Sequence, residues 1–165
     1  MEDSKIIKKL VEILGNQLGG STEANFATPL ITKQMLDWLA NAGAWDNYGL
    51  EIAVARHVNT SDKTLLFLAR EGCTEARRSC AARQFLPDKV AIYLSGELED
   101  LDITTSLARN RFTPAPALQK LAQSKYDCVR RLVAGHPKAP QELLERLVKD
   151  QDETVRVKAA RRIVA

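Results

Sequence analysis

The chain has 165 residues, which is enough for one domain with a continuous core but short for two independent ones. With 45% hydrophobic, 27% charged and only 5% aromatic residues, its composition is that of a folded globular chain and argues against an all-β sandwich. The net charge is only +3, with the basic excess toward the C-terminal end, and the longest apolar runs are far too short to span a bilayer.

The first predicted element is an N-terminal capping helix. Residues 1–10 lack the basic flank and continuous apolar stretch of a signal peptide, so we expect a cytoplasmic protein without a membrane partner. Residues 4–18 place their apolar side chains on one side of a helix that Gly19 and Gly20 would end, and residues 1–20 are therefore predicted to cap the fold. These apolar side chains are Ile6, Ile7, Leu10, Val11, Leu14 and Leu18.

Residues 21–48 form a degenerate leading repeat that is rich in aromatic side chains. A helix is expected from Thr32, and Trp38 on that helix is predicted to belong to the core of the cap. Trp45 lies in a loop-like segment and is the better candidate for contact with a partner, because aromatic side chains dominate interface energies. The remaining aromatic residues of this region are Phe26 and Tyr48.

From residue 49 to the end, the sequence repeats itself. Five similar segments start 26, 27, 26 and 26 residues apart, which gives four complete repeats and a terminal half repeat. Their first, fifth and sixth positions are small or apolar, and these positions form one stripe of a helix that a neighbouring helix can approach closely. The segments are LEIAVARH from Leu50, ARRSCAAR from Ala76, ITTSLARN from Ile103, VRRLVAGH from Val129 and VRVKAARR from Val155.

Each complete repeat continues with a polar connector and a second helix. Pro87, Pro114 and Pro140 suit the start of that helix, and Thr60 and Thr113 are expected to cap its free amides. Apolar pairs three residues apart then share one face. Since one such unit cannot bury its apolar stripe alone, we expect an all-α solenoid of stacked two-helix repeats. The pairs are Leu65 and Leu68, Ala91 and Leu94, Leu118 and Leu121, and Leu144 and Leu147.

One repeat carries a family resemblance. The sequence VRRLVAGHPKAPQELLERLVKDQDETVR, from Val129 to Arg156, is similar to the leucine-rich repeat variant pattern VRxxVAxNPxTPxxLLxxLAxDxxxxVR, with His136 in place of Asn. The three preceding repeats match more loosely. The resemblance implies a right-handed superhelix in which an α-helix alternates with a shorter 3₁₀ helix. Some family members hold an iron-sulfur cluster through cysteines ahead of the repeats, but the first cysteine here is Cys73, so no cofactor is expected.

The C-terminal half repeat ends without an evident polar cap. Its exposed side would include Ile163 and Val164. Because the ends of a solenoid normally need capping, we expect this end to contact a partner or a second copy of the chain, or its helix to fray.

Arginine is the main candidate for a binding surface. Arg77, Arg130 and Arg156 share one repeat position and are predicted to form a row of contact residues, with Arg109 and Arg161 as a second row. Such a ridge would suit an acidic protein or a phosphate backbone. Acidic residues precede several arginines at helical spacing, so ion pairs within the helices would equally explain them. These pairings are Glu75 with Arg78, Asp127 with Arg130 and Arg131, and Asp152 and Glu153 with Arg156.

Histidine and cysteine give no catalytic or metal site. His57 and His136 occupy the same repeat position, which indicates a role in ending the helix, and no nucleophile lies at a convincing spacing. The three cysteines have no metal-ligand spacing. Cys80 falls at a core position, whereas the exposure of Cys73 and Cys128 stays open.

The sequence therefore favours a non-enzymatic protein that recognises a macromolecule, most simply another protein, through an open surface of the solenoid. The alternative is nucleic-acid binding by the arginine ridge, which predicts an affinity that falls steeply with salt.

Overall fold

The computed structural model describes residues 32–41 and 48–164, and within these ranges the chain forms helices and no strand. The predicted all-α class is confirmed for this part of the chain. The expected capping helix over residues 1–20, most of the leading repeat and Trp45 lie outside the described residues. The chain divides into two compact units, Met1–Cys80 and Ala81–Ala165, and each is considered by itself. The single-domain organisation stays a prediction.

The first unit contains α2 (Lys33–Asn41), α3 (Tyr48–Arg56), α4 (Asp62–Glu71) and nearly all of α5 (Thr74–Ala81). Helix α4 packs against both α2 and α3. Ser61 caps the start of α4 by accepting a hydrogen bond from the Thr64 amide. Fully buried side chains from all four helices form the core of this unit: Leu36, Val54, Leu68 and Ala76.

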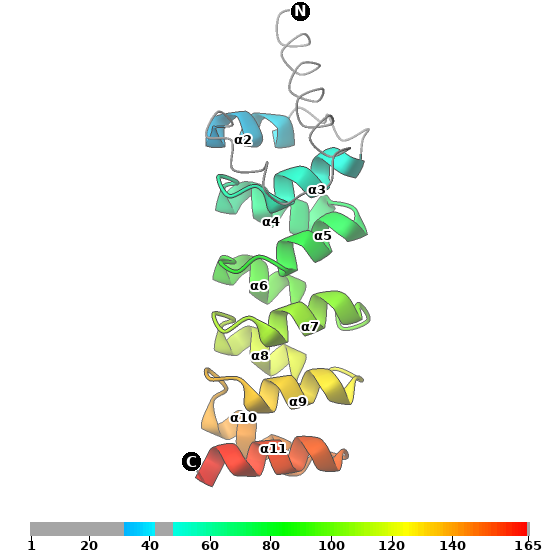
Figure 1. Ribbon diagram of the computed structural model, residues 1–165, viewed down its shortest axis with the longest axis vertical. Helices are drawn as coiled ribbons and strands as arrows, with labels where there is room; N and C mark the ends of the chain where they lie inside the picture. Colours follow the sequence, from blue (N-terminus) through cyan, green and yellow to red (C-terminus); the bar gives the residue numbers. More distant parts are fainter. Residues whose placement is uncertain (1–31, 42–47, 165) are drawn as a thin grey trace, which may run out of the picture. The chain divides into compact units, whose positions relative to one another are not determined.

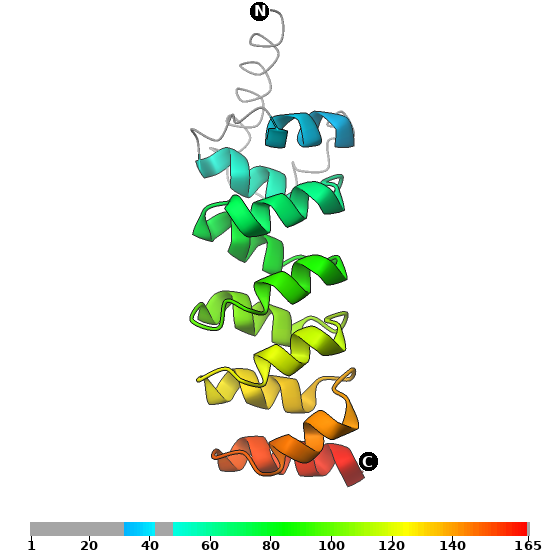
Figure 2. The same ribbon diagram turned by 180° about the vertical axis from the view of Figure 1, so that it is seen from behind.

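The second unit alternates longer and shorter helices: α6 (Asp88–Leu94), α7 (Leu101–Arg109), α8 (Ala115–Leu121), α9 (Asp127–Gly135), α10 (Gln141–Leu147) and α11 (Glu153–Val164). Helix α9 packs between α7 and α11 in one row, and α6 packs against α8 in the other. Figure 1 shows the row of α7, α9 and α11 from its own side, and Figure 2 shows α6, α8 and α10 from behind. The unit therefore has two layers of helices.

The predicted apolar columns form the core between these layers. The first and fifth repeat positions are buried without exception in this unit, at Ile103, Leu107, Val129, Val133, Val155 and Ala159. The second helices contribute Ala91, Leu94, Leu118, Leu121, Leu144 and Leu147. The sixth position is buried at Ala108 and Ala134 but exposed at Ala160, so the prediction for that last member was wrong. Helix α10 lies over α9 and α11, and no described helix lies beyond α11.

Two details of the connectors differ from expectation. The Thr113 hydroxyl donates to the carbonyl of Leu107, 2.7 Å away at the end of α7, and Thr60 donates in the same way to Val54. These threonine hydroxyls thus donate to carbonyls near the end of the preceding helix rather than cap the free amides of the following one. Pro114 at the start of α8 provides no side-chain cap. The second helices are also short α-helices, of seven residues in α6, α8 and α10, and not the 3₁₀ helices that the resemblance implied.

Candidate functional site

The side chains of the first predicted row, Arg77, Arg130 and Arg156, contact the chain's own backbone. Arg130 Nη1 donates to the carbonyls of Ser124 and Lys125, six and five residues earlier, at 2.9 and 3.1 Å. Arg156 Nη1 makes the same two contacts, with Asp150 and Gln151, both at 2.9 Å. Arg77 follows this pattern through a 3.3 Å bond to the carbonyl of Gly72. The row therefore fastens each first helix to the turn before it, since backbone carbonyls need a donor there.

Arg130 is the most deeply placed of the three. Its guanidinium forms a two-pronged ion pair with Asp150, at 2.8 Å from Nε and 3.0 Å from Nη2, and only 5% of the residue is exposed. The hydrogen bonds from Arg130 hold the pKa of Asp150 below its usual value, and Asp150 in turn raises the pKa of Arg130. We therefore correct the expectation that Arg130 is a surface contact residue. Its predicted pairing with Asp127 is replaced by Asp150, whereas the predicted pair of Glu75 and Arg78 is present at 2.9 Å.

The second predicted row behaves differently. Arg109 and Arg161 are exposed at the ends of α7 and α11, and neither forms a hydrogen bond or ion pair with another described residue. A cation in the last turn of a helix interacts favourably with the helix dipole, which is one reason for arginine there. Both guanidinium groups nevertheless remain open to a ligand.

A ladder of side chains joins the connectors that follow α5, α7 and α9 and the last turn of α11. Asn110 Nδ2 donates to the carbonyls of Arg83 and Gln84 at 2.9 and 3.2 Å, one repeat earlier. His136 Nε2 lies 2.8 Å from the carbonyl of Asn110, and Arg162 Nη2 lies 3.4 Å from the carbonyl of His136. Successive connectors are thereby held side by side within the second unit.

The hydrogen bonds of the ladder fix the tautomer of His136. Its Nδ1 atom accepts a hydrogen bond from the Lys138 amide at 3.1 Å, so the proton must reside on Nε2, which faces a carbonyl acceptor. Burial lowers the pKa of His136, and the nearby cations of Lys138 and Arg162 lower it further. The Nδ1 atom of His57 accepts a hydrogen bond from the backbone amide of Asn59 in the same way. This geometry supports the interpretation that the histidines end helices.

The three aligned connectors and the last turn of α11 form a surface that we call the basic edge. It comprises residues 82–85, 109–112, 135–138 and 161–164, which contain six basic side chains and no acidic one. Sequence reasoning identified Arg109 and Arg161 but missed Arg111 and Lys138, which lie beyond the helix ends. The absence of acidic residues from the same four stretches of the repeats was the signal that would have found them.

Two aromatic rings lie at the basic edge. Phe85 and Phe112 come from successive connectors, and their ring centroids are 5.2 Å apart with the planes tilted by 35°. The Arg111 guanidinium lies 5.4 Å and Lys138 Nζ 5.9 Å from the centroid of Phe112, within reach of a cation–π contact. Phe85 is 68% exposed, which is unusual for so large an apolar side chain. The edge thus combines open cations with an exposed aromatic surface.

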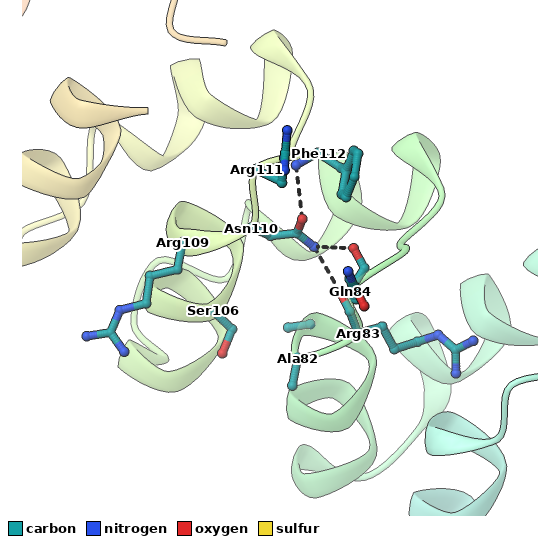
Figure 3. A pocket seen from close by; sticks show the side chains of 9 residues that line it. Ala82, Arg83, Gln84, Ser106, Arg109, Asn110, Arg111 and Phe112 are labelled. Atoms are coloured by element: carbon teal, nitrogen blue, oxygen red, sulfur yellow. Dashed lines mark hydrogen bonds between the residues drawn. The ribbon is translucent and has the colours of Figure 1, made fainter. Parts of the chain in front are cut away.

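A pocket of about 330 Å³ opens beside these rings. Its walls come from residues 81–84 and from the stretch between Ser106 and Phe112, all in the second unit. Figure 3 shows Ser106 on one side of the pocket and Ala82 on the other, with the Arg109 side chain extending away from Ala82. The pocket is near the lower limit of the sizes found for small-ligand sites.

The other candidate residues add no charge to the basic edge, although Ile163 and Val164 fall within its last stretch. Ile163 and Val164 are 41% and 87% exposed at the end of α11, as expected, but their role in self-association stays a prediction. Cys80 is buried, while Cys73 and Cys128 are half-buried, and burial raises the pKa of the Cys73 thiol. Among the described residues no cluster of His, Cys, Asp and Glu could hold a metal ion. No helix in the described ranges has the length and apolarity that crossing a membrane requires.

Comparison with known proteins adds no assignment. No protein-family model matches the chain, and neither a curated protein nor a solved structure shows significant similarity to it. The function must therefore be inferred from the geometry of the chain itself.

Proposed function

We propose that the chain is a non-enzymatic recognition module that binds an acidic segment of a partner protein along the basic edge. The observation that carries this proposal is the charge of three aligned connectors and the last turn of α11, which together hold six basic side chains and no acidic one. A surface of one sign attracts an oppositely charged segment and increases its rate of encounter. The partner contacts in this proposal are Arg109, Arg111 and Arg161.

The proposal includes the architecture that the repeats suggest. The helix pairs stack as a right-handed superhelix of the leucine-rich repeat variant type, with the connectors on one long edge. The bonds from Asn110, His136 and Arg162 to the preceding connector support this stacking, because each is made at the same repeat position. An extended binding surface is what such an architecture provides.

The helix dipole explains only part of the basic edge. Arg109 and Arg161 lie in the last turn of their helices, where a cation is favoured even without a partner. Arg111 and Lys138 lie in the connectors, where the dipole gives no such preference. Exposed Phe85 likewise contributes nothing to the core. Lys138 has a structural role as well, because its Nζ donates to the carbonyl of Phe112 at 3.1 Å. Arg111 and Phe85 therefore favour a surface that is used for binding more strongly than Lys138 does.

Single-stranded nucleic acid is the second candidate, and the aromatic pair is the observation in its favour. Bases stack on exposed aromatic rings in grooves lined by cations. Two observations favour protein instead. First, three arginines of the first helices donate hydrogen bonds to backbone carbonyls of the chain itself: Arg77, Arg130 and Arg156. Second, the net charge of +3 is small for a dedicated nucleic-acid binder.

The test compares two double variants of equal charge. Arg109→Glu with Arg161→Glu reverses two open cations of the basic edge, whereas Arg131→Glu with Arg146→Glu reverses two exposed arginines outside it. Binding of a fluorescent peptide of glutamate and glycine is measured at low and moderate salt. We expect the edge variant to bind about tenfold more weakly and the control variant to match the wild type.

Two outcomes contradict the proposal. If both double variants lose binding equally, only net charge matters and the basic edge is not the site. If a labelled single-stranded oligonucleotide binds the wild type more tightly than the peptide does, and the edge variant loses it, the nucleic-acid function replaces our proposal. Thermal unfolding of each variant verifies that it remains folded.

A further inference from the structure

The pocket at the basic edge exists because two small residues face each other. Ala82 occupies the seventh position of its repeat, and Arg56, Arg109 and Arg161 hold this position in three others. Ser106 occupies the fourth position of the next repeat, on the opposite wall. Neither side chain is long enough to cross the space between them, which leaves the cavity of about 330 Å³.

The corresponding place two repeats later is filled. There the seventh position is Gly135, and the fourth position of the following repeat is Lys158. A Cβ atom at Gly135 would lie only 2.7 Å from Lys158 Cε, so the lysine stem already occupies that space. The pocket beside Ala82 and Ser106 is therefore not a general property of the repeat.

The surroundings define what the pocket can accept. Ala81, Ala82 and the ring of Phe112 provide apolar wall, and Arg109 and Arg111 also line the pocket. The exposed Arg109 side chain extends away from Ala82 (Figure 3), and the Arg111 guanidinium lies 5.4 Å from the centroid of Phe112. An aromatic side chain fits this combination, since it would gain contact with the Phe112 ring while neighbouring carboxylates pair with these two arginines. A carboxylate would lose its hydration in the apolar part of the pocket without gaining a partner there, so it would stay outside.

We propose that this pocket receives one aromatic side chain of an acidic protein segment, so that the preferred ligand is an aromatic residue flanked by glutamate or aspartate. This inference rests on the proposed function, to which it adds sequence selectivity. The cations of the basic edge attract the segment, and the pocket beside Ala82 fixes its register. Aromatic anchors in small pockets commonly carry a large part of the affinity of such interfaces.

The experiment uses the whole chain and two fluorescent peptides of glutamate and glycine, one with a central tryptophan and one with alanine in its place. We expect the tryptophan peptide to bind the wild type roughly tenfold more tightly, the gain typical of burying one large side chain. Ser106→Lys copies the residue that fills the equivalent space near Gly135 and should abolish this preference. Ala82→Arg, which copies Arg109, is a second blocking variant.

The blocking variants add positive charge, which separates pocket filling from electrostatics. Gln119→Lys on α8 adds the same charge away from the pocket and serves as the control. The alanine peptide should bind both Ser106→Lys and Gln119→Lys at least as well as it binds the wild type. Only the advantage of tryptophan should disappear, and only in the blocking variants.

Each remaining outcome decides against one claim. Equal binding of the two peptides to the wild type overturns the pocket inference and leaves the basic edge as the site. A tryptophan preference that survives both blocking variants places the anchor elsewhere and also overturns it. If neither peptide binds, the proposed function itself fails. A labelled oligothymidine that binds tightly and is blocked by Ser106→Lys would assign the pocket to a nucleotide base.

Discussion

At the residue scale, the same task is performed by chemically different side chains. Asn110 accepts the Phe112 amide through Oδ1 and donates to the previous connector through Nδ2. His136 makes the same two kinds of contact with its two ring nitrogens. A neutral imidazole and an amide each offer one acceptor and at least one donor, which explains why both occur at this position.

This equivalence predicts how His136 affects the pH dependence of stability. Burial lowers its pKa in the folded state, so the folded chain binds fewer protons than the unfolded chain near the ordinary pKa of 6.5. The stability contributed by neutral His136 is therefore present above that value and is lost as the pH falls through the lowered pKa. His136→Asn should remove this loss while keeping both hydrogen bonds.

Urea unfolding of the variants provides the measurement. At about pH 7.5, His136→Asn should lie within about 0.5 kcal/mol of the wild type, and it should lose less stability than the wild type when the pH falls to about 5. His136→Leu is the control. It leaves the Lys138 amide without its acceptor and removes one of the two donors to the Asn110 carbonyl, and it should cost about 1–3 kcal/mol at either pH. Identical pH profiles for wild type and His136→Asn would contradict the assignment.

At the element scale, the pair of Arg130 and Asp150 ties α9 to the turn that follows α10. Both side chains are 7% exposed, and the Asp150 carboxylate also accepts the Asp152 amide at 2.8 Å. Removing one partner of a buried ion pair leaves an uncompensated charge. The pair therefore matters more to the packing of these elements than an exposed ion pair would.

Asp150→Asn tests this role. The amide keeps one oxygen acceptor but leaves the Arg130 charge unbalanced, and we expect a loss of about 3 kcal/mol in the free energy of unfolding. Asp152→Asn is the matched control, because its Oδ1 can still accept the Val155 amide at the start of α11. Its stability should change little. Chemical unfolding of both variants gives the comparison, and equal losses would show that the buried ion pair has no special weight.

The core positions of the helices were predictable from the sequence, because burial restricts the residue type directly. A small or apolar residue that recurs at a fixed repeat position indicates a core column, and Leu107 and Val133 confirm it. The type of the second helix was not predictable, because the resemblance carried the 3₁₀ expectation and no local residue decided it. Thr113 was misassigned because a threonine between two helices can bond to either, and only the backbone path decides which.

At the scale of the whole molecule, charge in the second unit is sorted most clearly between the two ends of α7. The stretch 97–102 at the start of α7 contains four acidic residues and no basic one, whereas the connectors after α7 and α9 and the last turn of α11 are basic. Favourable interaction with the helix dipole would produce such sorting at the helix ends. Its extension into the connectors, at Arg111 and Lys138, is what distinguishes the proposed binding surface from dipole compensation alone.

The candidate site was only partly visible in the sequence. Arginine side chains are long and can turn inward or outward at similar positions, so Arg130 and Arg109 could not be distinguished before their partners were known. The pocket depends on Ala82 and Ser106, which are far apart in the chain and individually unremarkable in type. Only the packing of successive repeats brings them to opposite walls.

The most direct measurement of the central claim is an NMR titration of the isotope-labelled chain with the acidic tryptophan peptide. We predict that amide resonances of residues 82–85 and 109–112 shift most, and that those of the acidic stretch 97–102 stay in place. Shifts that concentrate on the acidic stretch, or along the middle of α7, α9 and α11, would contradict the assignment of the basic edge as the binding surface.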